Sequence, residues 1–135
     1  MGTIYVATQV YYYSLDFLSS TTLFFGLGST AGTRCWMDTT NNNITTFSTT
    51  SRSDFEYSTK AYPGNSAFMV STSTAAMFSI WKTSDGLDER TLDCSSLGTE
   101  IDYSLFIPGI TYSIIALSEV KVAAINYQET PITSG

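Results

Sequence analysis

The sequence predicts an all-β protein, a single β-sandwich of the jelly-roll type with mainly antiparallel strands. Two stretches, at residues 54–81 and 100–117, repeat one pattern: an alternating strand, a Pro-Gly turn and a returning apolar strand. No segment holds a helical period, and short strand patterns recur about every 8–12 residues, as they do in sandwiches and barrels. At 135 residues the chain has the length of one domain, spanning residues 1–135.

The two repeated stretches are expected to have one buried and one solvated face. Because successive side chains in a strand point to opposite faces, the acidic Glu56 is expected in solvent and the aromatic Tyr57 in the core. Residues 100–103 follow the same pattern. Proline presets the first central dihedral of a turn and glycine accepts a positive φ, so the chain is expected to reverse at Pro63-Gly64 and Pro108-Gly109.

The remaining elements follow from alternation and from turn residues. The polar tract at residues 39–53 is predicted to be a long exposed loop, and residues 128–135 a tail. Further strands are predicted, in chain order, at residues 3–15, 23–27, 33–38, 66–72, 76–82, 91–94, 100–107, 110–118 and 120–127.

A family resemblance covers the run from Asp54 to Ser118. The run combines an acidic-aromatic strand, a Pro-Gly turn, the strand Met77-Phe78-Ser79-Ile80-Trp81 and the segment Ile107-Pro108-Gly109-Ile110-Thr111-Tyr112. In these features it resembles the bacterial pre-peptidase C-terminal domain, which implies a small β-sandwich of the jelly-roll sort. That family usually has an acidic residue where this chain has Ala75-Ala76, so the resemblance implies a fold and supplies no binding residue.

Charge and composition exclude several classes of partner. The net charge is −6 and the six basic residues are scattered singly, so we expect no nucleic-acid binding, which needs a basic face. The chain has no apolar run of about 18 residues and no basic patch for anionic lipids, so no membrane association is expected. Charged residues are only 13%, which predicts a neutral, hydroxyl-rich exterior.

The residue types that most enzymes need are missing or scattered. The chain has no histidine, which removes Ser-His-Asp and Cys-His triads and histidine-ligated zinc sites. The acidic pairs on strands are interpreted as solvated strand faces. Cys35 and Cys94 are expected to be buried free thiols, although a disulfide stays open if their strands are adjacent. We therefore expect no enzyme, no catalytic residue and no cofactor.

Metal binding is also not expected. Asp85, Asp88 and Glu89 could offer oxygen ligands to calcium, but their spacing does not fit an EF-hand loop. They are weak calcium candidates beside the alternative of an ordinary turn.

The leading functional hypothesis is a non-enzymatic structural protein of a virus particle, namely a decoration or cement protein on a phage capsid or another protein of the virion surface. No secretory signal is found at the N-terminus, whereas the neutral exterior suits the extracellular world, and a virion component made in the host cytoplasm satisfies both observations. Its partners would be other virion proteins and copies of itself. The interface candidates are Tyr11, Tyr13, Ile44 and Phe47.

The alternative hypothesis is a carbohydrate-binding module or a lectin retained in the cytoplasm. Aromatic faces suit the apolar face of a sugar ring, and the abundant hydroxyls suit its edges. In this reading the partner is a glycan, and Trp36 and Trp81 are the stacking candidates. Burial of both tryptophans in the core stays open.

Overall fold

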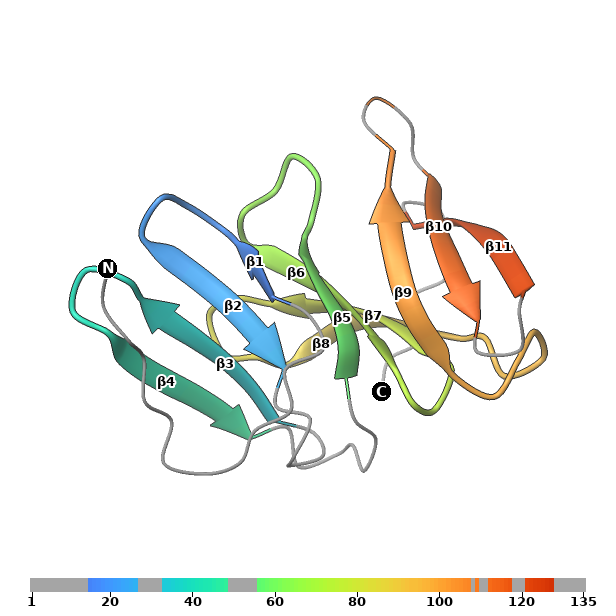
Figure 1. Ribbon diagram of the computed structural model, residues 1–135, viewed down its shortest axis with the longest axis horizontal. Helices are drawn as coiled ribbons and strands as arrows, with labels where there is room; N and C mark the ends of the chain where they lie inside the picture. The colour runs from blue at the N-terminus through green and yellow to red at the C-terminus, as the bar shows by residue number, and fades with distance from the viewer. Residues whose placement is uncertain are drawn as a thin grey trace.

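The protein is all-β and built from antiparallel sheets, which confirms the predicted fold class (Figure 1). The computed structural model describes residues 15–26, 33–48, 56–107, 109, 112–117 and 121–127. None of these segments forms a helix that could cross a bilayer. The strands are β1 (Leu15–Phe17), β2 (Thr22–Gly26), β3 (Thr33–Asp38), β4 (Asn43–Ser48), β5 (Glu56–Ala61), β6 (Phe68–Ser73), β7 (Met77–Lys82), β8 (Asp88–Asp93), β9 (Ile101–Phe106), β10 (Tyr112–Leu117) and β11 (Lys121–Asn126).

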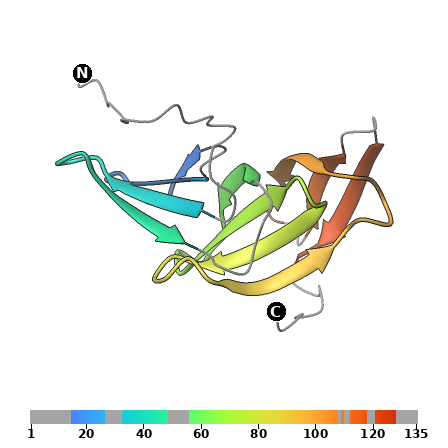
Figure 2. The ribbon, with the colours of Figure 1, turned by 90° about the horizontal axis from the view of Figure 1, so that it is seen from below.

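The strands form three sheets. The N-terminal sheet has the order β1-β2-β3-β4, the central sheet β5-β6-β7-β8, and the C-terminal sheet β11-β10-β9. Every described pairing joins strands that are consecutive in sequence, so each sheet is a meander, and the long-range pairings of a jelly roll are not among them. Figures 1 and 2 show the central sheet between the other two.

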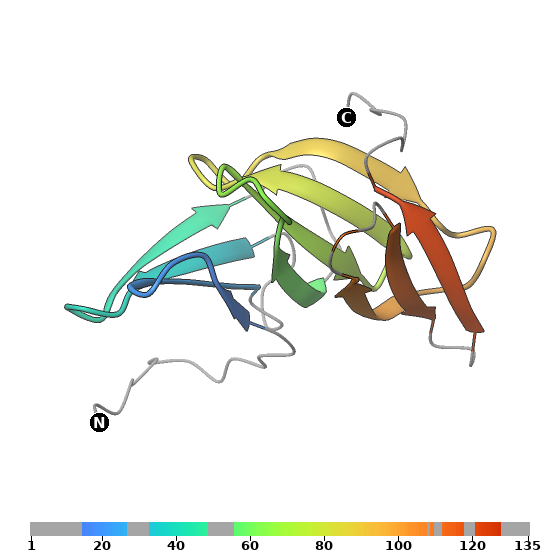
Figure 3. The ribbon, with the colours of Figure 1, turned by 90° about the horizontal axis from the view of Figure 1, so that it is seen from above.

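The central sheet is buried on both faces. Met69 and Trp81 pack against Phe24 of the N-terminal sheet, whereas Val70 and Ile80 belong to the core shared with the C-terminal sheet. Because neighbours along a strand point to opposite faces, β6 and β7 each contribute to two cores. The arched central sheet with the other two sheets against it is visible in Figure 3. This packing is sandwich-like, with one sheet common to two interfaces.

Many of the hydroxyl groups lie inside the protein, whereas the composition predicted them on the exterior. Oγ of Ser71 lies 3.4 Å from the Thr59 hydroxyl and accepts a hydrogen bond of 2.8 Å from Nε1 of Trp81. Small hydroxyl-bearing side chains allow close approach of sheets, but burying them requires such partners. The buried hydroxyl residues of the central and C-terminal sheets are Ser58, Thr59, Ser71, Thr72, Ser73, Ser79 and Ser104.

The tract at residues 39–53, predicted to be a long loop, contains strand β4, so that prediction is wrong for residues 43–48. Asp38 begins a tight turn, in which its carboxylate accepts a hydrogen bond from the Thr40 amide and its carbonyl one from the Asn42 amide. Asn42 adopts a φ of 61°, a conformation that asparagine tolerates. Residues 43–46 are exposed on both faces of the strand and have no apolar alternation, which is why the sequence pattern missed it.

Two β-bulges change which side chains face the core. The pairing of β5 with β6 skips Tyr57, and the pairing of β9 with β10 skips Asp102. A bulge reverses the alternation beyond it, so Ile101 is buried while Tyr103 is 47% exposed. Glu56, expected in solvent, is only 5% exposed. The prediction is therefore wrong for Glu56 and for Tyr103, whereas Ile101 is buried and Asp102 is exposed, as predicted.

The predicted Pro-Gly turns are confirmed at their glycines, since Gly64 has a φ of 75° and Gly109 a φ of 80°. Strand β3 has the predicted bounds. The predicted strand at residues 3–15 and the tail at residues 128–135 fall outside the described residues, except for Leu15.

Two glycines with the same φ of 75° should respond differently to alanine. A Cβ at Gly86 would lie 2.5 Å from Cβ of Phe47, whereas a Cβ at Gly64 would meet nothing within 4 Å. We expect Gly64→Ala to lower the free energy of unfolding by about 1–2 kcal/mol, from backbone strain alone. Gly86→Ala should cost a further 1–3 kcal/mol or so, from overpacking. Urea unfolding of both variants measures this, and equal losses would contradict the packing at Gly86.

Candidate interaction surface

The N-terminal sheet carries almost no free charge. Residues 1–51 contain three of the chain's 18 charged residues, namely Asp16, Arg34 and Asp38. Asp16 accepts a hydrogen bond of 2.8 Å from the amide of Ala61, and Arg34 is fully buried. The hydroxyl and amide of Thr40 donate to Asp38 and lower the pKa of its carboxyl group. Each of the three charges is thus held by a partner within the protein.

The exposed side chains of this sheet are apolar or uncharged and polar. On β1, Leu15 is 49% exposed and Phe17 is 54% exposed; on β4, Ile44 is 38% exposed. Asn43, Thr45 and Thr46 of β4 are also exposed. We call the exposed parts of β1 and β4 the neutral surface. Single exposed apolar residues are ordinary, and β1 and β4 are the opposite outer strands of this sheet. The depletion of charge around these residues is what is typical of a contact surface.

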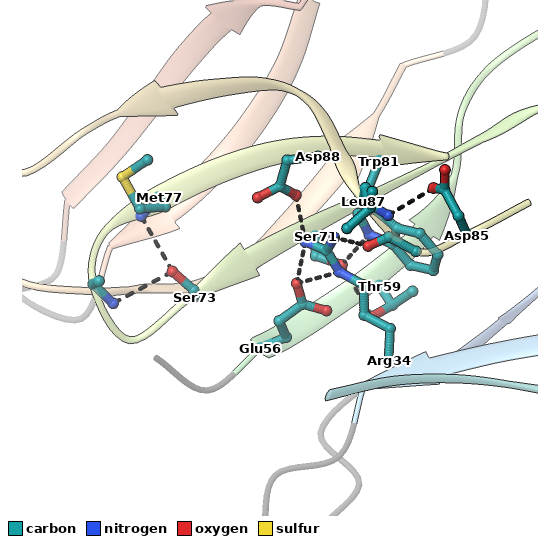
Figure 4. Close-up of polar contacts among 12 residues, drawn as sticks. Arg34, Glu56, Thr59, Ser71, Ser73, Met77, Trp81, Asp85, Leu87 and Asp88 are labelled. Carbon is teal, nitrogen blue, oxygen red and sulfur yellow. Dashed lines mark hydrogen bonds and ion pairs between the residues drawn. The ribbon is translucent and has the colours of Figure 1, made fainter. Parts of the chain in front are cut away.

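Arg34 fixes the N-terminal sheet to the central sheet (Figure 4). It rises from β3, and its Nε donates to Oε1 of Glu56 at 2.8 Å. Its Nη2 lies 2.6 Å from that same oxygen and 2.7 Å from Oδ1 of Asp88, and its Nη1 donates to the carbonyl of Gly86 at 2.6 Å. The rigid guanidinium fork therefore joins β3 to β5, to β8 and to the turn before β8.

An aromatic ring completes the surroundings of Arg34. The guanidinium carbon lies 4.7 Å from the ring centroid of Trp81, which is a cation-π contact. Phe24 meets the same tryptophan edge-on, with ring centroids 5.6 Å apart. A buried arginine without such partners would cost several kcal/mol in lost hydration. Two carboxylates and an aromatic face make its burial possible here.

The structure places the four predicted interface residues differently from one another. Tyr11 and Tyr13 fall outside the described residues. Ile44 is exposed on the outer strand β4 and belongs to the neutral surface. Phe47 is half-buried and packs against the core of Phe24, Met69 and Trp81, so most of its surface is already covered within the protein.

Neither of the two predicted sugar-stacking tryptophans has a fully exposed side chain. Trp81 is fully buried, so it cannot stack on a ligand, because Arg34 and Phe24 already cover its ring. Trp36 is half-buried against the same core. Burial of Trp81 was one of the two interpretations of the sequence, but its contact with Arg34 was not predicted, because the arginine lies 47 positions earlier in the chain.

The three calcium candidates do not converge. Asp85 accepts a hydrogen bond from the Leu87 amide, which lowers the pKa of its carboxyl group, and it pairs with Lys82 at 3.3 Å. Asp88 binds Arg34, and Glu89 is exposed on β8. Across the described residues, no group of three or more His, Cys, Asp or Glu side chains could hold a metal ion.

The cysteines are buried free thiols, as predicted. Cys35 lies in the N-terminal sheet with Leu23 and Met37, whereas Cys94 belongs to the core between the central and C-terminal sheets. Burial raises the pKa of Cys35, and it raises that of Cys94 to about 11, with a further contribution from Asp93. Both thiols are therefore poor nucleophiles at neutral pH.

A small pocket with a volume of about 140 Å³ opens beside strands β6, β7 and β8. Its walls combine two aromatic rings with an amide, a carboxylate and a guanidinium group. The lining residues are Tyr62, Asn65, Phe68, Ile80, Glu89 and Arg90.

Comparison with known proteins assigns no family. No family model matches the sequence, and no curated protein is significantly similar to it. The resemblance of residues 54–118 to the pre-peptidase C-terminal domain stays a prediction.

Removing one partner of Arg34 should destabilise the whole protein. Glu56→Gln keeps the shape of the side chain but removes the negative charge closest to the buried guanidinium. We expect a loss of about 3–5 kcal/mol in the free energy of unfolding, the range typical of a broken buried ion pair. The matched control is Glu89→Gln, the same change on an exposed residue of β8, which should cost less than about 0.5 kcal/mol. Equal effects in urea unfolding would contradict the anchoring role of Arg34.

The thiol of Cys94 should make stability depend on alkaline pH. Its pKa is raised from 9.0 to about 11, so the folded protein keeps a proton that the unfolded chain loses. This contribution to stability is complete below pH 9 and is lost as the pH rises toward 11. Urea unfolding between these pH values should show a smaller decline for Cys94→Val than for the wild type. An unchanged decline would contradict the raised pKa.

Proposed function

We propose that this protein is a non-enzymatic structural component of a virus particle, a capsid decoration or cement protein that acts through protein-protein contacts. The neutral surface of the N-terminal sheet is the contact surface. The observation that carries this proposal is the separation of charge along the chain: residues 1–51 have a net charge of −1, while residues 52–135 hold the other 15 charged residues.

The physical argument concerns desolvation. The core of a protein-protein interface is depleted in charged residues, because each ion loses its hydration when the partner docks. The neutral surface avoids that cost, and the exposed Leu15, Phe17 and Ile44 offer apolar area for burial. The acidic remainder of the molecule would face solvent and keep decorated particles from adhering to one another.

The chemistry of the described residues supports a role without catalysis. Both thiols are buried and have raised pKa values. The acidic residue nearest the buried arginine is itself 5% exposed and hence withdrawn from any substrate. In this proposal the protein is made in the host cytoplasm, its partners are other virion proteins and copies of itself, and it binds neither nucleic acid nor membrane.

The test uses two leucines of equal exposure. Leu15 on β1 is 49% exposed and Leu105 on β9 is 50% exposed. We expect Leu15→Glu to weaken binding to particles about tenfold, because it places a charge in the interface, while Leu105→Glu changes binding less than about twofold. Binding is measured by density-gradient banding with particles from the producing cells, followed by mass spectrometry.

Two results would contradict this proposal. The first is wild-type protein that stays at the top of the gradient with soluble proteins. The second is equal banding of the two leucine variants, which would remove the N-terminal sheet from the interface.

A carbohydrate-binding function remains the second candidate, and the pocket is the observation that favours it. Its aromatic walls, Tyr62 and Phe68, meet edge-on with ring centroids 6.1 Å apart. Asn65, Glu89 and Arg90 add the polar groups that sugar hydroxyls bind. This site replaces the predicted tryptophans. A glycan array probed with wild type and with Glu89→Ala tests it, and an array without hits removes this candidate.

A further inference from the structure

Strand β4 is an outer strand whose backbone lacks a partner on one side within the described residues. The amide of Thr39, just after β3, donates to the carbonyl of Thr21 beside β2. Successive residues of a strand direct their backbone amide and carbonyl groups alternately to its two sides. The backbone groups of Asp38 and Trp36 therefore point toward β4. The backbone groups of their partners, Asn43 and Thr45, point back toward β3. The amides and carbonyls of Ile44 and Thr46 therefore point outward.

In the part of the chain that the structure describes, this edge has none of the features with which proteins protect an outer strand. Asn43–Ser48 contains no charged residue, no proline and no register shift against β3. The other outer strands described each carry at least one protection: β1 is three residues long with Asp16, and β5 and β9 contain bulges. Strand β8 carries four charged residues, and β11 begins with Lys121. The absence of protection is thus specific to β4.

We propose that β4 pairs with β4 of a second copy of this chain, antiparallel and about a two-fold axis at Thr45. The outward backbone groups allow this register, in which Ile44 of one copy forms the hydrogen-bonded pair with Thr46 of the other, and the reverse. Thr45 faces Thr45 of the other copy as a non-hydrogen-bonded pair, with Cα atoms about 4.5 Å apart. The two N-terminal sheets become one continuous eight-stranded sheet.

Charge selects a second copy as the occupant. Two chains that each carry a net charge of −6 repel one another, and an uncharged strand lets two copies meet without bringing like charges together. Residues 39–51 contain no ionisable side chain, and β4 lies within that run. In each pair across the axis, a β-branched or aromatic side chain of one copy lies opposite a side chain of the other copy that carries a hydroxyl or an amide group. No charge is buried in these pairs. A basic partner would find no acidic group on this strand.

The test exploits the fact that Thr45 faces itself. Thr45→Lys and Thr45→Glu each place two like charges opposite one another, which destabilises a strand pair, whereas a mixture of the two variants places opposite charges there. Thr45 is exposed, so both variants should fold. The matched controls are Ser84→Lys and Ser84→Glu, the same charge changes at an exposed residue of the β7–β8 turn.

Self-association is measured by sedimentation velocity over a concentration series of the purified protein. We expect the wild type and both Ser84 variants to dimerise, each Thr45 variant to dimerise at least about tenfold more weakly, and their mixture to recover the wild-type affinity. A monomeric wild type, unaffected Thr45 variants, or a mixture without recovery would overturn the proposal.

This inference rests on the proposed function for its setting, but its experiment needs no particle. Dimerisation without banding on particles would count against the proposed function alone. Banding on particles by a protein that stays monomeric would count against the pairing of β4 alone.

Discussion

The burial of Arg34 is the constraint on which the rest of the structure depends. One guanidinium group binds two carboxylates and a backbone carbonyl of the central sheet while its face lies against Trp81. Because an unpaired charge at this depth is very unfavourable, the N-terminal sheet can dock only in the position that completes these contacts. The arginine thus supplies orientation, and the apolar contacts of Phe24 and Met69 supply most of the burial.

The same ion pair explains why the N-terminal sheet can present a neutral exterior. The single positive charge of residues 1–51 is turned inward, and Asp16 is bound to the Ala61 amide. Two of the three charges of this layer, Asp16 and Arg34, are thus bound to the central sheet, and Asp38 is bound within its own turn. Solubility then depends on the acidic residues of the central and C-terminal sheets.

Local pattern predicted much of the fold and little of the site. The bounds of β3, the turns at Gly64 and Gly109 and the buried thiols follow from alternation, turn chemistry and composition. The burial of Glu56 could not be predicted, because it depends on an arginine from another sheet and on a bulge. Burial of Trp81 was one interpretation of the sequence, but its contact with that arginine was not predicted. Strand β4 was missed because its stability comes from pairing with β3. The uncharged run of residues 1–51 was visible in the sequence, but its folding into one layer was not.

The uneven distribution of charge also has a kinetic consequence. A molecule with one neutral layer and an acidic remainder is oriented by electrostatic repulsion as it approaches an acidic surface. Its charged end is held back by repulsion, so the neutral layer leads during diffusion. For a partner that binds the neutral layer, as we propose, productive collisions then form a larger share of all encounters, and lowering the ionic strength should sharpen this orientation while slowing the approach itself.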